Sequence, residues 1–444
     1  MQRFAIALVA LHFAAVPAFA QDAARMETVI RADADKGDFM GAVLVAKDGK
    51  ILLDKGYGSA NLEWKIANDG DTKFRLGSVT KQFTATAILL LAERGKLSLD
   101  APVKTYLTDA PASWDKVTVR NLLNHSAGIP NFTGFDDYGK TKALATTPTD
   151  LIARFRDKPL DFAPGERMDY SNSGYVVLTA IVEKASGQPY GAFVADNIFK
   201  PLGMADSGYD SHKTVLARRA SGYTPSPAGV VNADYLDMTV PQGAGGLYST
   251  THDLLKWQSA LFGGKVLKPE SLTAYTTPFK NNYALGVIVA KADGKTSFEH
   301  SGGIDGFNTW LGYDPDSRVT VIVLANLNGG AASKLGKSMM TLGRGGEVTL
   351  ASERKAIAVA PATAREYVGE YALSPTVSTT VRYEGGKLTA QMTNQEAFEI
   401  FAEKPDFFFF RVVDAQIAFT RDASGKVTGA VLHQGGRQMP VTKK

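Results

Sequence analysis

Strand-like segments lie far apart in this sequence, with a long helical stretch between them. Near the start, 41–47 and 51–54 are apolar runs on either side of an Asp-Gly turn, which predicts a β-hairpin. Strand character returns only at 284–290, 309–313 and 319–325. Because strands from both ends must find partners, we expect one sheet with an inserted helical lobe, which is an α+β fold. A cleft between sheet and lobe is a usual place for a small-molecule site.

The helices are placed by the spacing of their apolar residues. This spacing predicts a helix from about Ser78 to Arg94, and Gly95 lies where a glycine commonly ends a helix. Further helices are expected over five shorter segments: 119–124, 150–157, 175–185, 251–262 and 334–341.

The last part of the chain has a different character. Short strands are expected there at 381–383, 387–392, 407–413, 417–420 and 427–433. Turns rich in glycine, aspartate and proline separate them, and five or more short strands in about 80 residues predict a small β-barrel. We therefore expect a first domain over 21–346, a linker over 347–363 and a barrel domain over 364–444.

The first twenty residues have the pattern of a secretory signal peptide. Arg3 precedes a short apolar stretch, and Ala18-Phe19-Ala20 has the small-x-small form of a cleavage site. The alternative is a buried N-terminal helix. We expect cleavage near Ala20 and a periplasmic or secreted protein. No later apolar run reaches the length of about 18 residues that a membrane span needs, so we expect none.

Charge and residue types argue against several classes of function. The net charge of +4 is small and scattered, so we expect no nucleic-acid partner. Without cysteine there is no disulfide, thiolate nucleophile or Cys-ligated metal. The six histidines form no His-x-x-x-His pair, so we expect neither a zinc site nor another cofactor.

A serine–lysine pair opens the most apolar helix. In Ser78-Val79-Thr80-Lys81, positions i and i+3 share one helix face, so the Lys81 amine can reach the Ser78 hydroxyl. The helix N-terminus adds free N–H groups, and burial would lower the pKa of Lys81 and favour a neutral base. The alternative is an ordinary N-cap with a solvated lysine. Two more Ser-x-x-Lys copies begin at Ser113 and Ser352; they lack such a helix, and we interpret them as chance.

Two more short motifs carry groups suited to hydrolysis. In Tyr170-Ser171-Asn172, a phenol can relay a proton and an amide can orient Lys81 or a substrate carbonyl, although such a tripeptide also fits a turn. His300-Ser301-Gly302-Gly303 precedes the strands expected at 309 and 319, and its glycines would let a substrate lie against a strand edge. The remaining histidines after the signal segment are interpreted as structural: His125, His212, His252 and His433.

Five motifs in order resemble the class C β-lactamase-like family of penicillin-recognising serine hydrolases. They are Phe74 to Lys81, Leu122 to Gly128, Pro164-Gly165 leading to Tyr170-Ser171-Asn172, Gly243 to Leu247, and His300-Ser301-Gly302. The resemblance covers about residues 25–345 and implies a β-lactamase/transpeptidase-like antiparallel sheet flanked by helices. The tail from Tyr367 onward resembles, more loosely, a lipocalin-like barrel that could cap the cleft, restrict substrate size or form an oligomer contact.

The resemblance also implies roles for single residues. Ser78 is then the nucleophile, Lys81 its base partner, Tyr170 a proton relay and Asn172 an orienting group. The backbone N–H groups of Ser78 and Gly303 form the oxyanion hole in this comparison, with Ser301 and Gly302 beside them. His300 replaces the lysine of the familiar Lys-Thr-Gly motif, which removes a fixed charge for a substrate carboxylate and leaves a neutral imidazole as a possible further proton relay.

The expected function is that of a serine hydrolase that forms an acyl-enzyme with amide or ester substrates. Small peptides containing D-amino acids are the first expectation, as for a D-Ala-D-Ala carboxypeptidase or a D-aminopeptidase. A carboxylesterase or β-lactamase of the same fold is the alternative. A second alternative is a penicillin-binding or sensor protein that does not turn over. The sequence leaves the substrate, the deacylation rate, the role of the barrel and the oligomeric state open.

Overall fold

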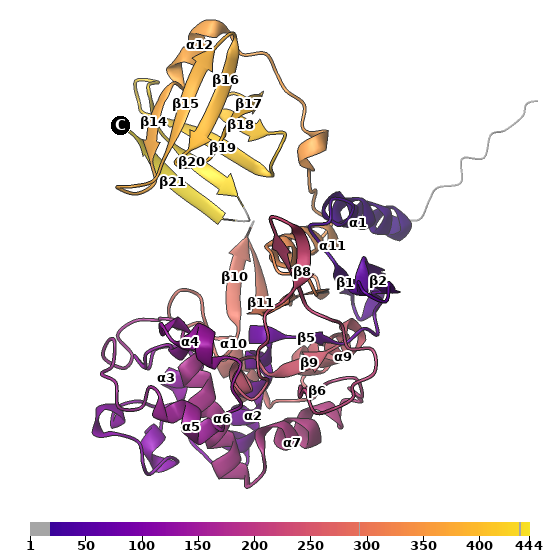
Figure 1. Cartoon of the computed structure of the whole chain (residues 1–444), viewed down its shortest axis with the longest axis vertical. Helices are drawn as coiled ribbons and strands as arrows, with labels where there is room; N and C mark the ends of the chain where they lie inside the picture. The colour runs from indigo at the N-terminus through magenta and orange to yellow at the C-terminus, as the bar shows by residue number, and fades with distance from the viewer. Residues whose placement is uncertain (1–17, 293, 435–436) are drawn as a thin grey trace, which may run out of the picture.

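The computed structural model describes residues 18–292, 294–434 and 437–444 (Figure 1). Its largest sheet has six strands in the order β10-β11-β12-β13-β1-β2. All five neighbouring pairs are antiparallel. The strands are β1 Gly41–Lys47, β2 Lys50–Tyr57, β10 Ile288–Ala292, β11 Lys295–Ile304, β12 Phe307–Asp314 and β13 Val319–Ala325. The sheet built from distant segments and the hairpin at its start are both confirmed. Asp48 and Gly49 make the turn, each with a positive φ.

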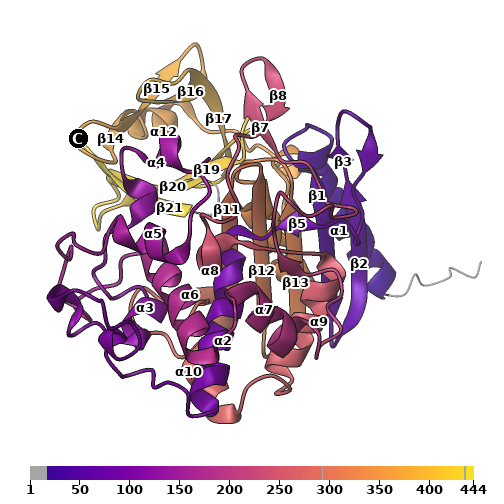
Figure 2. The ribbon, with the colours of Figure 1, turned by 60° about the horizontal axis from the view of Figure 1, so that its bottom comes forward.

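Strands β1 and β13 are buried on both faces, which explains their largely apolar sequences. In β1, Leu44 packs in the cluster shared with the helical lobe, whereas Val43 and Val45 pack in a second cluster. That second cluster belongs to α1 (Ala18–Ala34) and α11 (Ala331–Gly343). Figure 2 shows the lobe helices lying in front of the sheet. The result is three layers, with the sheet in the middle.

The inserted lobe occupies the chain between β2 and β10, as expected. Its helices include α2 Thr80–Glu93, α3 Val119–Leu123, α4 Tyr138–Thr141, α5 Pro148–Ala153, α6 Asn172–Ser186, α7 Tyr190–Val194, α8 Gln242–Gly245, α9 Thr251–Phe262 and α10 Pro269–Thr276. The helix expected at 150–157 is shifted toward the N-terminus because the Thr147 hydroxyl caps it, accepting from the Asp150 N–H, with Pro148 at the first helical position. Gly95 follows α2 with a φ of +69°, as its expected place after the helix requires.

Strands β10 and β11 differ from the prediction. The strand expected at 284–290 begins only at Ile288. The segment Lys295–Ile304, which we expected to precede the strands, is itself strand β11. Its polar residues and two glycines hide the alternating pattern, and pairing with β12 from Phe298 to Ile304 holds it extended. His300 therefore lies within a strand of the main sheet.

The C-terminal domain is a closed barrel of eight strands, β14 to β21. They are β14 Gly369–Ala372, β15 Ser378–Glu384, β16 Lys387–Met392, β17 Ala397–Lys404, β18 Phe407–Phe410, β19 Ala415–Arg421, β20 Val427–Gln434 and β21 Arg437–Lys443, preceded by α12 Pro361–Glu366. The predicted barrel is confirmed, but β14, β17 and β21 were not expected. Most of the predicted signal segment 1–20 lies outside the described residues, which begin with α1 at Ala18. Within the described ranges, no helix is long and apolar enough to cross a membrane.

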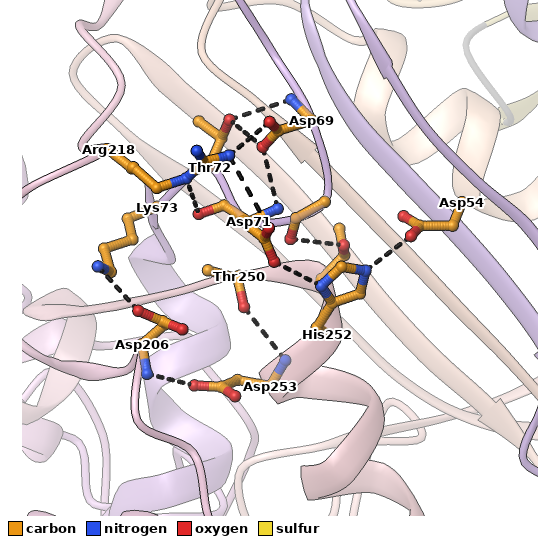
Figure 3. Close-up of polar contacts among 12 residues, drawn as sticks. Asp54, Asp69, Asp71, Thr72, Lys73, Asp206, Arg218, Thr250, His252 and Asp253 are labelled. Atoms are coloured by element: carbon orange, nitrogen blue, oxygen red, sulfur yellow. Dashed lines mark hydrogen bonds and ion pairs between the residues drawn. The ribbon is translucent and has the colours of Figure 1, made fainter.

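His252 links helix α9 to strand β2 and to the segment that contains Asp71 (Figure 3). His252, in the first turn of α9, contacts Asp54 of β2 through Nε2 at 2.6 Å and Asp71 through Nδ1 at 2.8 Å. Burial alone would lower the pKa of His252, but the hydrogen bonds and charges of the two carboxylates outweigh it and raise the pKa.

This arrangement predicts a pH-dependent stability. A raised folded-state pKa contributes stability that is fully present below the unfolded value of about 6.5 and is lost as pH rises through the folded pKa of His252. The His252→Gln variant should therefore have a lower thermal midpoint than the parent at pH 5.5, and the difference should shrink at pH 9. Thermal scans of both proteins across this range provide the measurement. A difference that does not change with pH would contradict the ion-pair role.

Candidate active site

Ser78 lies in a single 3-10 turn, Gly77–Val79, that leads directly into α2. Gly77 has a φ of +53°, and a Cβ there would lie 2.9 Å from the Gly303 nitrogen. Only glycine combines this backbone with so close an approach to β11. The turn thus presents the Ser78 hydroxyl beside the strand that carries the His300 motif.

Lys81 is fully buried and lies against the nucleophile candidate. Its Nζ is 3.1 Å from Ser78 Oγ, 2.9 Å from Asn172 Oδ1 and 2.8 Å from the Ala244 carbonyl oxygen. The pairing expected from the i, i+3 spacing is therefore present. Burial holds the pKa of Lys81 well below its usual range, because an ammonium ion loses its hydration there.

Tyr170 and Asn172 reach the same place from the start of α6. The Asn172 Nδ2 group donates to the Thr133 hydroxyl at 3.2 Å, which directs its oxygen toward Lys81. The Tyr170 ring centre lies 4.8 Å from the Lys81 amine. Its buried hydroxyl makes no regular hydrogen bond to any described residue. Burial raises the pKa of Tyr170, and the nearby Ser78 hydroxyl opposes that shift in part.

His300 is buried, and each of its two ring nitrogens has a hydrogen-bond partner within the protein. Nδ1 lies 2.6 Å from the Ser301 carbonyl oxygen, so it carries the hydrogen. Nε2 then accepts from the Tyr283 hydroxyl at 2.9 Å. Burial, with the Lys81 amine as a second cause, lowers the pKa of His300 to about 3. The imidazole is neutral, as expected. Its Nε2 faces Tyr283, and its Nδ1 is bound by the backbone carbonyl of Ser301, not by the Ser301 hydroxyl.

This placement predicts that His300 does not titrate during turnover. The pH profile of kcat/KM between pH 5 and 8 should have the same inflections in the parent and in His300→Gln, whatever the drop in rate. The reason is that a group with a pKa of about 3 stays neutral across this range. Steady-state rates in a constant-ionic-strength buffer series are the measurement. An inflection near pH 6.5 that disappears in the variant would show that His300 titrates as a free imidazole.

The edge of β11 beyond Glu299 faces the nucleophile turn. Strand β10 pairs with β11 only up to the Ile288–Glu299 pair, so residues 300–304 extend beyond it. A Cβ at Gly302 would lie 2.0 Å from the Leu76 carbonyl oxygen, which shows how closely β11 approaches the chain before Ser78. Gly303 lines the same pocket as Ser78. The structure therefore brings together the residues proposed for the oxyanion hole.

Two further aromatic residues pack in this cluster. We interpreted His125 as structural, and its ring centre lies 4.2 Å from that of Tyr170 and 4.6 Å from that of Tyr283. Its Nδ1 accepts the Ser171 N–H at 3.2 Å, while its buried Nε2 contacts no hydrogen-bond partner among the described residues. The motif Leu122 to Gly128 contains His125 and could have flagged it. Tyr283 belongs to none of the five motifs, so the sequence held no signal for it.

The pocket at Ser78 lies between the lobe and the edge of β11. Its lining residues are Gly77, Ser78, Phe132, Thr133, Tyr138, Asn172, Leu236, Pro241, Ala244, Gly245, Gly303, Ile304 and Asp305. Asp305 alone of these carries a charge. Lys142 pairs with Asp305 at 2.5 Å and with Asp234 at 3.2 Å, so this group of three keeps a net negative charge. Across the described ranges, no group of three or more His, Asp and Glu side chains could hold a metal ion.

Known proteins share this sequence and fold. PbpX of Bacillus subtilis strain 168, a penicillin-binding protein by its name, is 33% identical over 67% of this chain and 73% of its own. The octameric penicillin-binding protein homologue of Pyrococcus abyssi is 25% identical, with a TM-score of 0.68 over 94% of this chain and 99% of its own. A D-stereospecific amidohydrolase of Streptomyces is 26% identical, with a TM-score of 0.61 over 72% of this chain and 97% of its own.

Two family models divide the chain between them. One described as a domain of unknown function (DUF3471) matches residues 353–442, the barrel with part of the segment before it. The other, described as Beta-lactamase, matches residues 26–339 and so includes the sheet, the lobe and every residue of the site. The chain therefore belongs to the beta-lactamase family of penicillin-binding proteins and serine hydrolases.

Proposed function

We propose that this protein hydrolyses amide bonds of small D-amino-acid derivatives through an acyl-enzyme on Ser78. The observation that carries the proposal is the set of three contacts made by Lys81. A neutral amine has two N–H groups and one lone pair. The Asn172 and Ala244 oxygens can only accept, so they take the two N–H groups. The lone pair is then left for the Ser78 hydroxyl, 3.1 Å away.

Burial supports this division of roles. It favours the neutral form of Lys81, a base, and the neutral form of Tyr170, an acid. Lys81 takes the Ser78 proton as Ser78 Oγ attacks the carbonyl carbon, and the N–H groups of Ser78 and Gly303 stabilise the oxyanion. Tyr170 relays the proton to the departing nitrogen. Water then attacks the acyl-enzyme and gives one proton to the same groups, which pass it to Ser78 Oγ as the ester bond breaks and the acid leaves.

The charge of the pocket supports a substrate with a free amine. Asp305 is its only charged lining residue, so a substrate ammonium group has an anionic partner and a substrate carboxylate has none. This favours an aminopeptidase or amidase over a carboxypeptidase or β-lactamase. The Streptomyces structure named a D-stereospecific amidohydrolase agrees with that preference. An esterase uses the same groups, and the apolar lining at Phe132, Leu236 and Ile304 suits an uncharged acyl group.

A panel of substrates tests the proposal. We would compare D-alanine p-nitroanilide, its L-isomer, its N-acetylated form, p-nitrophenyl acetate and a chromogenic cephalosporin. The expected order places the free D-amine first and both the acetylated form and the cephalosporin well below it. Faster turnover of the cephalosporin or of a D-Ala-D-Ala peptide would reject the aminopeptidase assignment. A stable adduct with labelled penicillin and no turnover of any substrate would favour a binding protein.

Asp305→Asn should weaken the recognition of the amine. We expect KM for D-alanine p-nitroanilide to rise by about 10-fold or more, since a hydrogen bond to a charged group contributes about 1.5–3 kcal/mol. The kcat/KM for p-nitrophenyl acetate should stay within about 2-fold. Asp234→Asn is the matched control, because Asp234 pairs with the same Lys142 but its side chain is 81% exposed and outside the pocket. Equal effects of the two variants would contradict direct contact by Asp305.

We also propose that the protein acts outside the cytoplasm, because its first twenty residues have the signal pattern described above. Expression of the full chain in a bacterial host, followed by cell fractionation and N-terminal sequencing, tests this. Mature protein beginning at Gln21 in the periplasm or medium is expected. Uncleaved protein confined to the cytoplasm would reject the proposal.

A further inference from the structure

The C-terminal barrel is filled at one end and hollow at the other. At the filled end, Tyr367 follows α12 and packs against Phe408 and Phe419, with ring centres 4.8 Å and 4.6 Å away. The Tyr371 hydroxyl donates to the Tyr367 carbonyl at 2.7 Å and holds Tyr367 in this packed position. In Figure 1 α12 lies at the end of the barrel farther from the first domain.

The other end encloses a cavity lined by inward-facing side chains. Eight apolar residues form most of its wall, among them Ala390, Met392, Phe398, Phe410, Ile417 and Leu432. Polar groups at the rim come from Gln395, Glu396 and Gln434, which stand at or beside the turns between strands, and from Gln416 and His433. Asp414, in the turn between β18 and β19 at the same end, pairs with Lys334 of α11 at 3.2 Å. The hollow end therefore lies next to the first domain.

Thr379 distinguishes this cavity from a simple packing defect. Its side chain lines the cavity and is only 4% exposed, and its Oγ1 has no hydrogen-bond partner among the residues that the structure describes. Leaving a buried hydroxyl unpaired is costly, and valine would fill the same volume without that cost. A hydroxyl at this position is explained if a bound molecule completes its hydrogen bond.

We propose that the barrel binds a small neutral molecule with an apolar body and one hydrogen-bonding group, such as an aliphatic alcohol. The apolar wall contacts the body, and Thr379 contacts the polar group. Glu396 is the one carboxylate of the lining, so an anionic ligand is disfavoured. The cavity shares no lining residue with the pocket at Ser78, so this is a second site and does not depend on the hydrolase proposal.

Methionine-methyl NMR provides a direct readout. The full-length Ser78→Ala protein, labelled at its methionine methyl groups, is titrated with 1-hexanol; this background excludes acyl transfer to the alcohol. We expect a saturable shift of the Met392 signal, identified by its loss in Met392→Leu. Met204, buried in the first domain, should not shift. No shift at Met392, or one that grows without saturating, would overturn the proposal.

Thr379→Val tests the polar contact without changing the shape of the cavity. We expect the affinity for 1-hexanol to fall by about 3- to 10-fold, which is the loss of one neutral hydrogen bond. In the absence of ligand the thermal midpoint should not fall, because the lost hydroxyl had no protein partner. Thr380→Val, on the neighbouring position of β15 that points to the other face, is the matched control and should bind as the parent does. Equal affinity in both variants would leave the cavity a site for water or nonspecific apolar contact and reject the proposal.

Discussion

Replacing Ser78 by alanine should lower kcat/KM for D-alanine p-nitroanilide by roughly 10⁴- to 10⁶-fold, the loss seen when a serine nucleophile is removed from an intact site. The variant keeps the pocket and the Gly303 edge, so it still binds substrate, but no atom remains to form the acyl-enzyme. Its thermal midpoint should stay close to that of the parent, because Ser78 is small and only half-buried. Initial rates at matched protein concentration, checked by thermal scans, provide the measurement.

The chain supplies its own control for this variant. Ser113 begins a second Ser-x-x-Lys sequence, in a 3-10 turn with no long apolar helix behind it. Ser113→Ala should keep the parental rate. Mass spectrometry after incubation with a slow acylating agent should show an adduct on the parent and on Ser113→Ala, and none on Ser78→Ala. Equal hydrolysis by Ser78→Ala and the parent would remove Ser78 as the nucleophile.

The local part of the site could be predicted from the sequence, since it depends on helix geometry alone. Ser78 and Lys81 are three positions apart, and any helix that begins there brings them together. The contact between Lys81 and Asn172 spans 91 positions and depends on how α6 packs against α2. The chemistry of the Asn172 amide suggested that it could orient Lys81, and the resemblance to a known family supported placing it at the site. Neither helix geometry nor the family resemblance pointed to Tyr283, because its place beside His300 is set by the path of a loop.

The same distinction applies to the fold. Strands β1 and β13 are buried on both faces and are largely apolar in sequence, so both could be predicted. Strand β11 has two glycines and several polar residues because part of its edge faces the site, and this disguised it. In the barrel, β21 contains Pro440 and many polar residues, yet it pairs with both β20 and β14 and closes the sheet. Its identity as a strand comes from those partners.

Replacing Lys81 by methionine separates the base from the rest of the site. We expect kcat to fall by roughly 10²- to 10⁴-fold, the usual contribution of a positioned general base. Methionine fills most of the volume of the lysine stem and needs no hydration, so the burial of α2 is kept. Single-turnover measurements with p-nitrophenyl acetate should show that acylation, the step in which Ser78 loses its proton, is slowed.

Two further measurements test whether Lys81 acts as a neutral amine: the thermal midpoint of the variant and the pH dependence of the rate. Burial lowers the pKa of the folded Lys81 amine, so the folded chain holds the Lys81 proton less tightly than the unfolded chain does. Folding the parent therefore costs free energy that the methionine variant does not need, and its thermal midpoint should not be lower. The parental rate should fall as pH decreases through the folded pKa of Lys81, where the lone pair becomes protonated, and this acid limb should be missing from Lys81→Met. If Lys81→Met kept the parental rate within a few-fold, another group would have to take the Ser78 proton, and Tyr170, whose hydroxyl lies beside Ser78, would become the candidate base.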